Sequence, residues 1–343
     1  MTRFDVTDFG AVADGKSDDA PAIQRALDAA RDAGGGTVAV PGGTYAVYQT
    51  LRIYSLTTMV LEKNALIRRA APTNAMIING TNGKGGYDGS ENIEINGGTW
   101  DARMNLNEVK CTVIAIGHAR DIKIRDVRVL DVRDWHGIEL NGVDHAEVSG
   151  CYFHGFTLTR RWSEAIQLDL MLSPAAFPWF GPYDYTHCRN ILIQGCTFTG
   201  GWYRGVGSHA KADGVYHAYI RIANNHFDSL TGEGVEAYRY RHVSIDGNTF
   251  NRVETGIRLL DCAYCTITGN NMRYPAKDGI VLIGSAYNAI TGNIIRGAGG
   301  TGVDILEQSS QNNVSGNIFT GIAGPVVREC GKQGNTMTGN IGK

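Results

Sequence analysis

Acidic and polar side chains recur at equivalent positions of a six-residue pattern in the middle of this 343-residue chain. In each copy the second residue is small, the third and fifth are mainly apolar, and the fourth and sixth vary. This alternation predicts a β-strand with one buried face. The variable positions carry mainly carboxylates, amides and an imidazole in the early copies and mostly aliphatic side chains in the last copies. The copies are 136–141, 164–169, 204–209, 233–238, 255–260, 278–283 and 301–306.

The polar positions could perform general acid–base chemistry if successive copies stack as neighbouring strands. Strand alternation predicts an outward set of catalytic candidates, which are Glu139, Asp169, His209 and Glu236. At a strand spacing of about 4.8 Å, Asp169 and His209 would be in contact, and Glu139 would lie about 8 Å from Asp169. That separation falls within the roughly 6.5–9.5 Å between the acid and base of an inverting glycosidase. Glu236 would lie about 12 Å from Asp169.

Glu164 is a further candidate at the entrance of its strand. Alternation would turn its side chain inward, so a buried carboxylate that stabilises a turn competes with a catalytic role. The same caution applies to the outward set, because polar residues on an exposed sheet are ordinary. The concentration of acids beside the longest insertions of the chain favours a carbohydrate-active site.

Substrate-binding candidates surround these acids. Aromatic faces stack on the apolar faces of sugars, although they also pack loops onto a scaffold. The aromatic candidates are Trp162, Trp179, Trp202, Tyr203 and Tyr238. The polar candidates are Asn141, Gln167, Arg204 and Arg258.

A regular period identifies the scaffold that positions these residues. Six asparagines recur in the second half of the chain at steps of 23, 22, 23, 24 and 23 residues. They are Asn225, Asn248, Asn270, Asn293, Asn317 and Asn340. A fixed period of this length predicts a solenoid, in which equivalent positions stack in columns. The repeats lack the helix and fixed leucines of a leucine-rich repeat, so we expect an all-β, single-stranded right-handed parallel β-helix with an internal asparagine ladder.

The first 45 residues differ from the rest of the chain. Residues 22–33 have helical periodicity and end at a run of three glycines, so we expect an N-terminal helix that caps the first coil. Residues 46–343 are expected to form the coils, within a single domain of residues 1–343. Loop insertions are expected at 154–163 and 170–187.

Composition excludes several classes of protein. The net charge is −2 without a basic run, so we expect no nucleic-acid partner. No apolar stretch reaches the roughly 18 residues of a membrane span, so we expect no membrane insertion. The seven cysteines are odd in number, which argues against a disulfide framework, and we expect no metal site. The first residues do not read as a signal peptide, which suggests a trimmed sequence or export by another route, such as within a virion.

The opening segment, residues 8–45, contains Asp8-Phe-Gly-Ala-Val-Ala-Asp-Gly15 and ends in Val40-Pro41-Gly-Gly-Thr-Tyr45. It resembles the N-terminal signature of the pectate-lyase-like superfamily, in particular the glycosyl hydrolase family 28-related or pectate-lyase-3-like proteins. The resemblance implies a polysaccharide substrate and an extracellular or virion-associated protein, because the group includes phage tail depolymerases. A tail-associated protein would be expected to form a homotrimer. The full motif sets of polygalacturonases and of classical pectate lyases are absent.

Three functions therefore compete. The first is a glycoside hydrolase that cleaves a cell-surface or cell-wall polysaccharide, with Asp169 and Glu139 as acid and base and His209 tuning one of them. The second is a lyase or epimerase acting on uronates, in which nearby arginines or a calcium ion held by the acids would neutralise the substrate carboxylate. The third is a non-catalytic glycan-binding tail adhesin. No cofactor is expected unless the calcium-assisted alternative holds.

Overall fold

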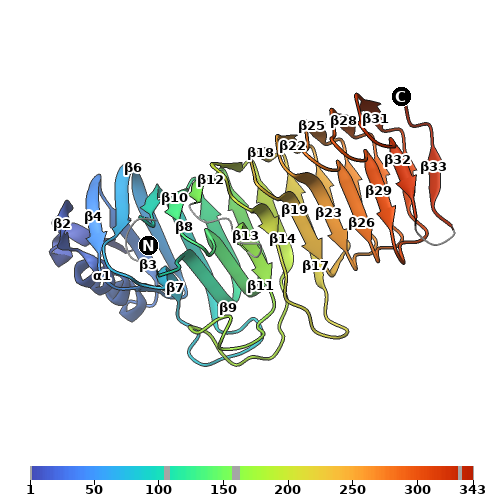
Figure 1. Ribbon diagram of the computed structural model, residues 1–343. Coiled ribbons are helices and arrows are strands. Elements are labelled where there is room, and N and C mark those ends of the chain that lie inside the picture. The colour runs from blue at the N-terminus through green and yellow to red at the C-terminus, as the bar shows by residue number, and fades with distance from the viewer. Residues whose placement is uncertain (1, 104–108, 157–162, 331–333, 343) are drawn as a thin grey trace. The chain divides into compact units, whose positions relative to one another are not determined.

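The computed structural model describes residues 2–103, 109–156, 163–330 and 334–342. The chain forms two compact units. Unit 1 comprises Met1–Arg160 with Ile166–Cys188, and unit 2 comprises Arg161–Ala165 with Arg189–Lys343. Both are built from short parallel strands that follow one another as rungs, which confirms the expected right-handed parallel β-helix (Figure 1). Within the described residues, no helix is long and apolar enough to span a membrane.

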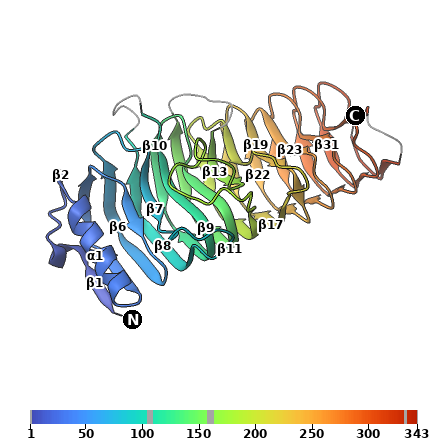
Figure 2. The ribbon, with the colours of Figure 1, turned by 90° about the horizontal axis from the view of Figure 1, so that it is seen from below.

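The N-terminal cap of unit 1 contains the predicted helix. The helix α1 spans Ala20–Asp32, close to the predicted 22–33, and buries Ile23, Ala26 and Leu27. It packs against the first strands of the unit, as Figure 2 shows. The other elements of the cap are β1 (Arg3–Asp5), the 3-10 helix η1 (Val6–Phe9) and β2 (Asp14–Asp18). The apolar face of α1 thus covers a coil end that would otherwise be exposed.

The coils of unit 1 place one column of strands in parallel register. Leu51 pairs with Ile77, Ile77 with Ile114, Ile114 with Ile138 and Ile138 with Ile166, so the buried positions stack in line. Strands β5, β7, β9, β11 and β13 make this column. The strands of the coils are β3 (Gly36–Val40), β4 (Gly43–Val47), β5 (Leu51–Ile53), β6 (Thr57–Arg69), β7 (Ala75–Asn79), β8 (Ser90–Asp101), β9 (Thr112–Arg125), β10 (Arg128–Val132), β11 (Ile138–Ser149), β12 (Tyr152–Phe156) and β13 (Glu164–Asp169), whose first two residues belong to unit 2.

Unit 2 repeats the same coil with a shorter period. Its strands are β14 (Arg189–Gln194), β15 (Thr197–Thr199), β16 (Arg204–Gly207), β17 (His217–Ala223), β18 (His226–Asp228), β19 (Glu233–Tyr238), β20 (Tyr240–Arg241), β21 (Ser244–Asp246), β22 (Thr249–Asn251), β23 (Thr255–Leu260), β24 (Thr266–Thr268), β25 (Asn271–Arg273), β26 (Ile280–Ile283), β27 (Ala289–Thr291), β28 (Ile294–Arg296), β29 (Val303–Leu306), β30 (Asn313–Ser315), β31 (Ile318–Thr320), β32 (Val327–Glu329) and β33 (Thr336–Thr338). Its core includes a stack of phenylalanine rings, in which Phe198 and Phe227 lie 4.6 Å apart and Phe227 and Phe250 lie 4.7 Å apart.

The predicted asparagine ladder is present in unit 2. Asn248 donates from Nδ2 to Asn270 Oδ1 at 3.0 Å, and Asn270 donates in the same way to Asn293 at 3.0 Å. Each amide also donates to a backbone carbonyl, as Asn270 does to Ile245 at 2.9 Å. The ladder provides hydrogen-bond partners for buried polar groups at the turns, which would be costly to leave unpaired. It therefore has a structural role, as expected.

Candidate active site

A buried cluster of carboxylates surrounds one arginine in unit 2. Arg204 forms ion pairs through Nη1 with Glu164 at 2.9 Å, through Nε with Glu233 at 2.9 Å and through Nη2 with Glu236 at 2.8 Å. Its side chain is only 2% exposed. The planar guanidinium offers its donors in a fixed fork, so it holds the three carboxylates in set directions.

Two partly exposed residues connect this cluster to solvent. Arg258 Nη1 lies 2.5 Å from Glu233 and 3.3 Å from Glu236. His209 Nε2 lies 3.9 Å from Glu164 Oε2. The side chains of Arg258 and His209 are each 26% exposed, whereas those of the three glutamates are at most 5% exposed. Arg258 and His209 are therefore the members of this group that solvent reaches most readily.

Strand register explains how the cluster forms. Gly207 on β16 pairs with Glu236 on β19, and Glu236 pairs with Arg258 on β23, so these residues form a row on the outer face. Gly207 is essential to the row, because a Cβ there would lie 2.9 Å from Glu164 Cγ and 3.3 Å from Arg204 Cδ. The absent side chain leaves the space that Glu164 and Arg204 occupy.

The electrostatics of the cluster single out Glu236. Burial raises the pKa of Glu236 to about 7, helped by Glu233 and Glu164 and opposed by Arg204 and Arg258. Burial lowers the pKa of Arg204, but the charges of Glu164, Glu236 and Glu233 outweigh burial and raise it overall. Three carboxylates face two guanidinium groups, so a proton on Glu236 would balance the charge. A carboxylic acid that keeps its proton near neutral pH beside ionised carboxylates is the pattern of acid–base catalysis.

Residues 3–116 match the family model described as rhamnogalacturonase A/epimerase, pectate lyase-like, and residues 182–325 match that of the periplasmic copper-binding protein NosD. The A-module of a mannuronan C-5 epimerase from Azotobacter vinelandii superposes with a TM-score of 0.79 at 17% identity, covering 99% of this chain and 95% of that one. An exopolygalacturonase from Thermotoga maritima superposes with a TM-score of 0.68 at 14% identity, covering 100% and 92% of the two chains.

The family model that residues 3–116 match is described as pectate lyase-like, and the superposed structures share the fold of this chain. This confirms the resemblance of residues 8–45. A curated relative, the plasmin and fibronectin-binding protein A of Streptococcus pneumoniae, is 30% identical over 288 residues, which cover 74% of this chain and 40% of the relative. The chain therefore matches less than half of that relative's length. The solved structure of this pneumococcal adhesin has a TM-score of 0.76 at 24% identity and covers 99% of both chains, a likeness that shows the fold alone.

The other two acids that the sequence predicted to be catalytic, Glu139 and Asp169, are buried in unit 1. Glu139 and Asp169 were expected to face solvent, but both are 0% exposed. Glu139 accepts hydrogen bonds from Thr112 Oγ1 at 2.8 Å and from Asn141 Nδ2 at 3.0 Å. Asp169 accepts from the backbone N–H of Leu170 at 2.9 Å and from Gln167 Nε2 at 3.0 Å. The expectation of exposure is therefore wrong for this pair and for Asn141 and Gln167.

The 170–187 insertion packs on the outer face of the same strand column. Met171, Phe177 and Phe180 pack against Ile78 and Ala115, which lie on the outer face of the same strand column. Trp179 packs at the edge of this cluster. The insertion thus covers outer-face residues that a bare coil would leave open to solvent. A groove over Glu139 and Asp169, with the insertion only as its wall, does not fit this packing.

The aromatic candidates divide into three groups. Trp202 is 0% exposed, so it packs in the interior and cannot offer a face to a sugar, contrary to expectation. Tyr203 lies at the cluster, with its ring centroid 5.1 Å from the Arg204 guanidinium carbon, and Tyr238 is half-buried at the end of β19. Trp162 and most of the 154–163 insertion lie outside the described residues.

Glu164 differs from its expected direction. Alternation would turn its side chain inward, but it lies over the outer side of Gly207 and binds Arg204. Glu233, which was not among the main candidates, binds both Arg204 and Arg258. A signal was present in the sequence, because Glu164, Arg204 and Glu233 occupy the first position of three successive copies of the strand pattern. Asp169 belongs to unit 1 and His209 to unit 2, so their contact stays a prediction.

Proposed function

We propose that this pectate-lyase-like chain is a glycoside hydrolase that cleaves a cell-surface or cell-wall polysaccharide. Glu236 carries the proposal, because its pKa of about 7 lets it hold a proton at neutral pH within a group of carboxylates. The similar proteins support a carbohydrate-related role in general, since they include exopolygalacturonases, mannuronan epimerases and a phage tailspike in complex with a pentasaccharide. Several are surface or phage proteins, in keeping with an extracellular or virion-associated role. For a tail-associated protein we propose a homotrimer.

In the proposed reaction Glu236 donates its proton to the glycosidic oxygen as the bond to the leaving sugar breaks. Glu164, which is ion-paired with Arg204 and would have to be uncovered as substrate binds, either attacks the anomeric carbon to form a glycosyl ester that water then hydrolyses, or removes a proton from the attacking water. His209 lies beside Glu164 and would adjust its charge. The stereochemistry of the product would decide between the two roles of Glu164. Asp169 and Glu139 form a second acid pair, proposed from the sequence, and both would have to become exposed in order to act.

The decisive experiment compares Glu236→Gln with wild type on a polysaccharide that the wild type demonstrably cleaves. Removal of a general acid should lower kcat by roughly 100-fold or more, while leaving a folded protein. Wild-type kcat/KM should fall as pH rises above about 7, because Glu236 then loses its proton. Asp246→Asn is the matched control, since Asp246 pairs with Arg221 elsewhere in unit 2 and should leave kcat unchanged. Full activity of Glu236→Gln would refute the assignment and leave Asp169→Asn as the next test.

A lyase or epimerase acting on uronates is the second candidate. It is favoured by stretches of 47 and 45 residues that are 62% and 61% identical to a mannuronan C-5 epimerase and an alginate lyase, respectively. Arg258 is the partly exposed cation that could neutralise a uronate carboxylate. A lyase would release unsaturated products that absorb at 235 nm, and a calcium-assisted enzyme would lose activity with chelator. Hydrolysis predicts neither outcome.

A non-catalytic adhesin is the third candidate, favoured by the similarity to the plasmin and fibronectin-binding protein A. Such a module would bind a glycan without releasing products, and Glu236→Gln would not change that binding. A glycan-array screen followed by product mass analysis separates this outcome from both enzymatic ones.

A further inference from the structure

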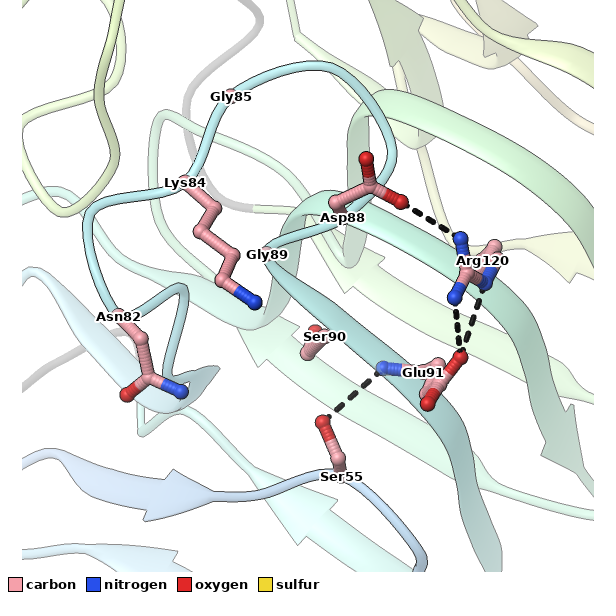
Figure 3. Close-up of a pocket in the computed structure, with 9 residues that line it drawn as sticks. All are labelled: Ser55, Asn82, Lys84, Gly85, Asp88, Gly89, Ser90, Glu91 and Arg120. Atoms are coloured by element: carbon pink, nitrogen blue, oxygen red, sulfur yellow. Dashed lines mark hydrogen bonds and ion pairs between the residues drawn. The ribbon is translucent and has the colours of Figure 1, made fainter.

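A second polar site lies in unit 1, on coils near the N-terminal cap. A pocket of about 510 Å³ opens between the turn after β5, the loop 80–89 and the middle of β9. Its volume lies in the range of about 300–1,000 Å³ that is usual for small-ligand pockets. The nine lining residues include no aliphatic or aromatic side chain; they are Ser55, Asn82, Lys84, Gly85, Asp88, Gly89, Ser90, Glu91 and Arg120 (Figure 3). Most ligand pockets are largely apolar, so this lining selects a ligand rich in hydrogen-bonding groups.

One charge in the pocket stands apart from the others. Arg120 is held by Glu91, whose Oε2 lies 2.9 Å from Nε and 2.6 Å from Nη2, and by Asp88 at 2.6 Å. Lys84 extends from the loop toward the pocket, and within the described parts of the chain its ammonium has no hydrogen-bond or ion-pair partner (Figure 3). An ammonium offers three donors and no acceptor. Lys84 is therefore the group in the lining that is free to bind an anion.

The rest of the lining matches hydroxyl groups. The Asn82 amide, which has no side-chain partner among the residues that the structure describes, can both donate and accept. Ser55 Oγ accepts from the backbone N–H of Glu91 at 3.1 Å, which leaves its O–H to donate. The carboxylates of Asp88 and Glu91 each use one oxygen on Arg120 and keep the other as an acceptor.

The loop that forms the pocket is fixed from behind. His118 is fully buried, and its ring nitrogens lie 2.8 Å from Gly86 O and 2.6 Å from Pro182 O. These two contacts fix the orientation of the imidazole ring between the loop and Pro182. The backbone N–H of Gly86 also donates to Asp184 Oδ2 at 2.8 Å. A Cβ at Gly89 would lie 2.5 Å from His118 O. Such a constrained loop can bind a ligand without first losing much conformational freedom.

We propose that this pocket binds one acidic sugar residue of a polysaccharide, with a uronate carboxylate on Lys84 and sugar hydroxyls on Asn82, Ser55, Asp88 and Glu91. One negative charge among several hydroxyls is the chemistry of a hexuronate. It complements one free ammonium among polar donors and acceptors, because the charges of Asp88 and Glu91 are already paired with Arg120. The site lies in unit 1 and does not depend on hydrolysis by the Glu236 cluster of unit 2. Its role would be to hold an acidic chain, whatever reaction follows.

The test measures binding by calorimetry to the intact chain, with tetragalacturonate and tetramannuronate as acidic probes and galactotetraose as the neutral probe. We expect at least one acidic probe to bind, the neutral probe to bind at least 10-fold more weakly, and Lys84→Gln to weaken acidic binding at least 10-fold. Lys63→Gln, an exposed lysine of β6 outside the pocket, is the matched control and should bind as wild type does. His118→Ala should loosen the loop, which faster hydrogen exchange across residues 80–89 would report, and should weaken binding without removing a lining group.

Repeating the titration with Glu236→Gln separates the two sites. Acidic binding that survives this substitution but is lost in Lys84→Gln supports the pocket even if no polysaccharide is ever cleaved. Equal binding of the neutral probe, unchanged binding in Lys84→Gln, or the absence of binding to both acidic probes would overturn the proposal.

Discussion

Glu236 couples the proposed chemistry to folding at the scale of a single residue. It holds its proton up to about pH 7 in the folded chain, whereas an ordinary glutamate releases it near 4.5. Between these values the folded state binds more protons than the unfolded state, so stability falls as pH rises and the loss is complete above about 7. The difference corresponds to on the order of 3 kcal/mol.

Glu236→Gln should remove this pH dependence. The unfolding free energy of the variant minus that of the wild type, both measured in urea, should therefore increase from pH 5 to pH 8. Glu147 provides a control of opposite sign, because Arg125 lowers its pKa and its contribution is lost as pH falls. Parallel curves for the wild type and Glu236→Gln would contradict the assigned protonation.

Arg204 is the residue on which the cluster depends. Arg204→Met would leave three buried carboxylates without their shared partner, so we expect a loss of roughly 3–5 kcal/mol in unfolding free energy. Arg221→Met is the control, because Arg221 is 59% exposed in its pair with Asp246 and should cost at most about 1 kcal/mol. A similar loss in both variants would show that the cluster is not specially stabilised by Arg204.

At the scale of elements, the asparagine ladder is the clearest source of stability. Asn270→Ala would remove two donated hydrogen bonds and the acceptor of both Asn248 N–H groups, all of them buried. We expect a loss of about 3 kcal/mol, since each buried group left unsatisfied costs about 1–3 kcal/mol. Asn340→Ala, at the half-buried end of the ladder, should cost about 1 kcal/mol. Equal losses of unfolding free energy in the two variants would contradict the idea that burial increases the contribution of a ladder asparagine.

The elements also show what the sequence could predict. The recurring asparagines and strand copies predicted the coils, because period and alternation depend only on local spacing. The helix of residues 20–32 followed from its apolar face. The burial of Glu139 and Asp169 could not be predicted in the same way, because it depends on contacts beyond a single strand, such as the hydrogen bond from Thr112 to Glu139. The direction of the Glu164 side chain was predicted wrongly, because that side chain occupies the space left by Gly207 on the neighbouring strand. Alternation within one strand gives no information about that space.

At the scale of the whole molecule, the described coils are stabilised by packing and hydrogen bonds without a disulfide. Within the described residues no cysteine forms a disulfide; six are buried and Cys330 is exposed. We expect one thiol to react with a thiol reagent in the native protein and seven after unfolding. A reducing agent should leave the melting temperature unchanged. Fewer than seven thiols after unfolding under non-reducing conditions would reveal a bond that this structure lacks.

The asparagine ladder has a further consequence for how such chains evolve. Asn270 and Asn293 occupy equivalent places, and the residues that follow them, Asn271 and Ile294, pair directly. Removing residues 271–293 would therefore connect Asn270 directly to Ile294, which occupies the place of Asn271 one coil later. The strand register of every remaining coil would stay intact. Unequal recombination could lengthen or shorten the gene one whole coil at a time, while insertions of other sizes would be restricted to the loops. Genes for this architecture should thus differ in length by multiples of about 23 codons, the step that the ladder itself imposes.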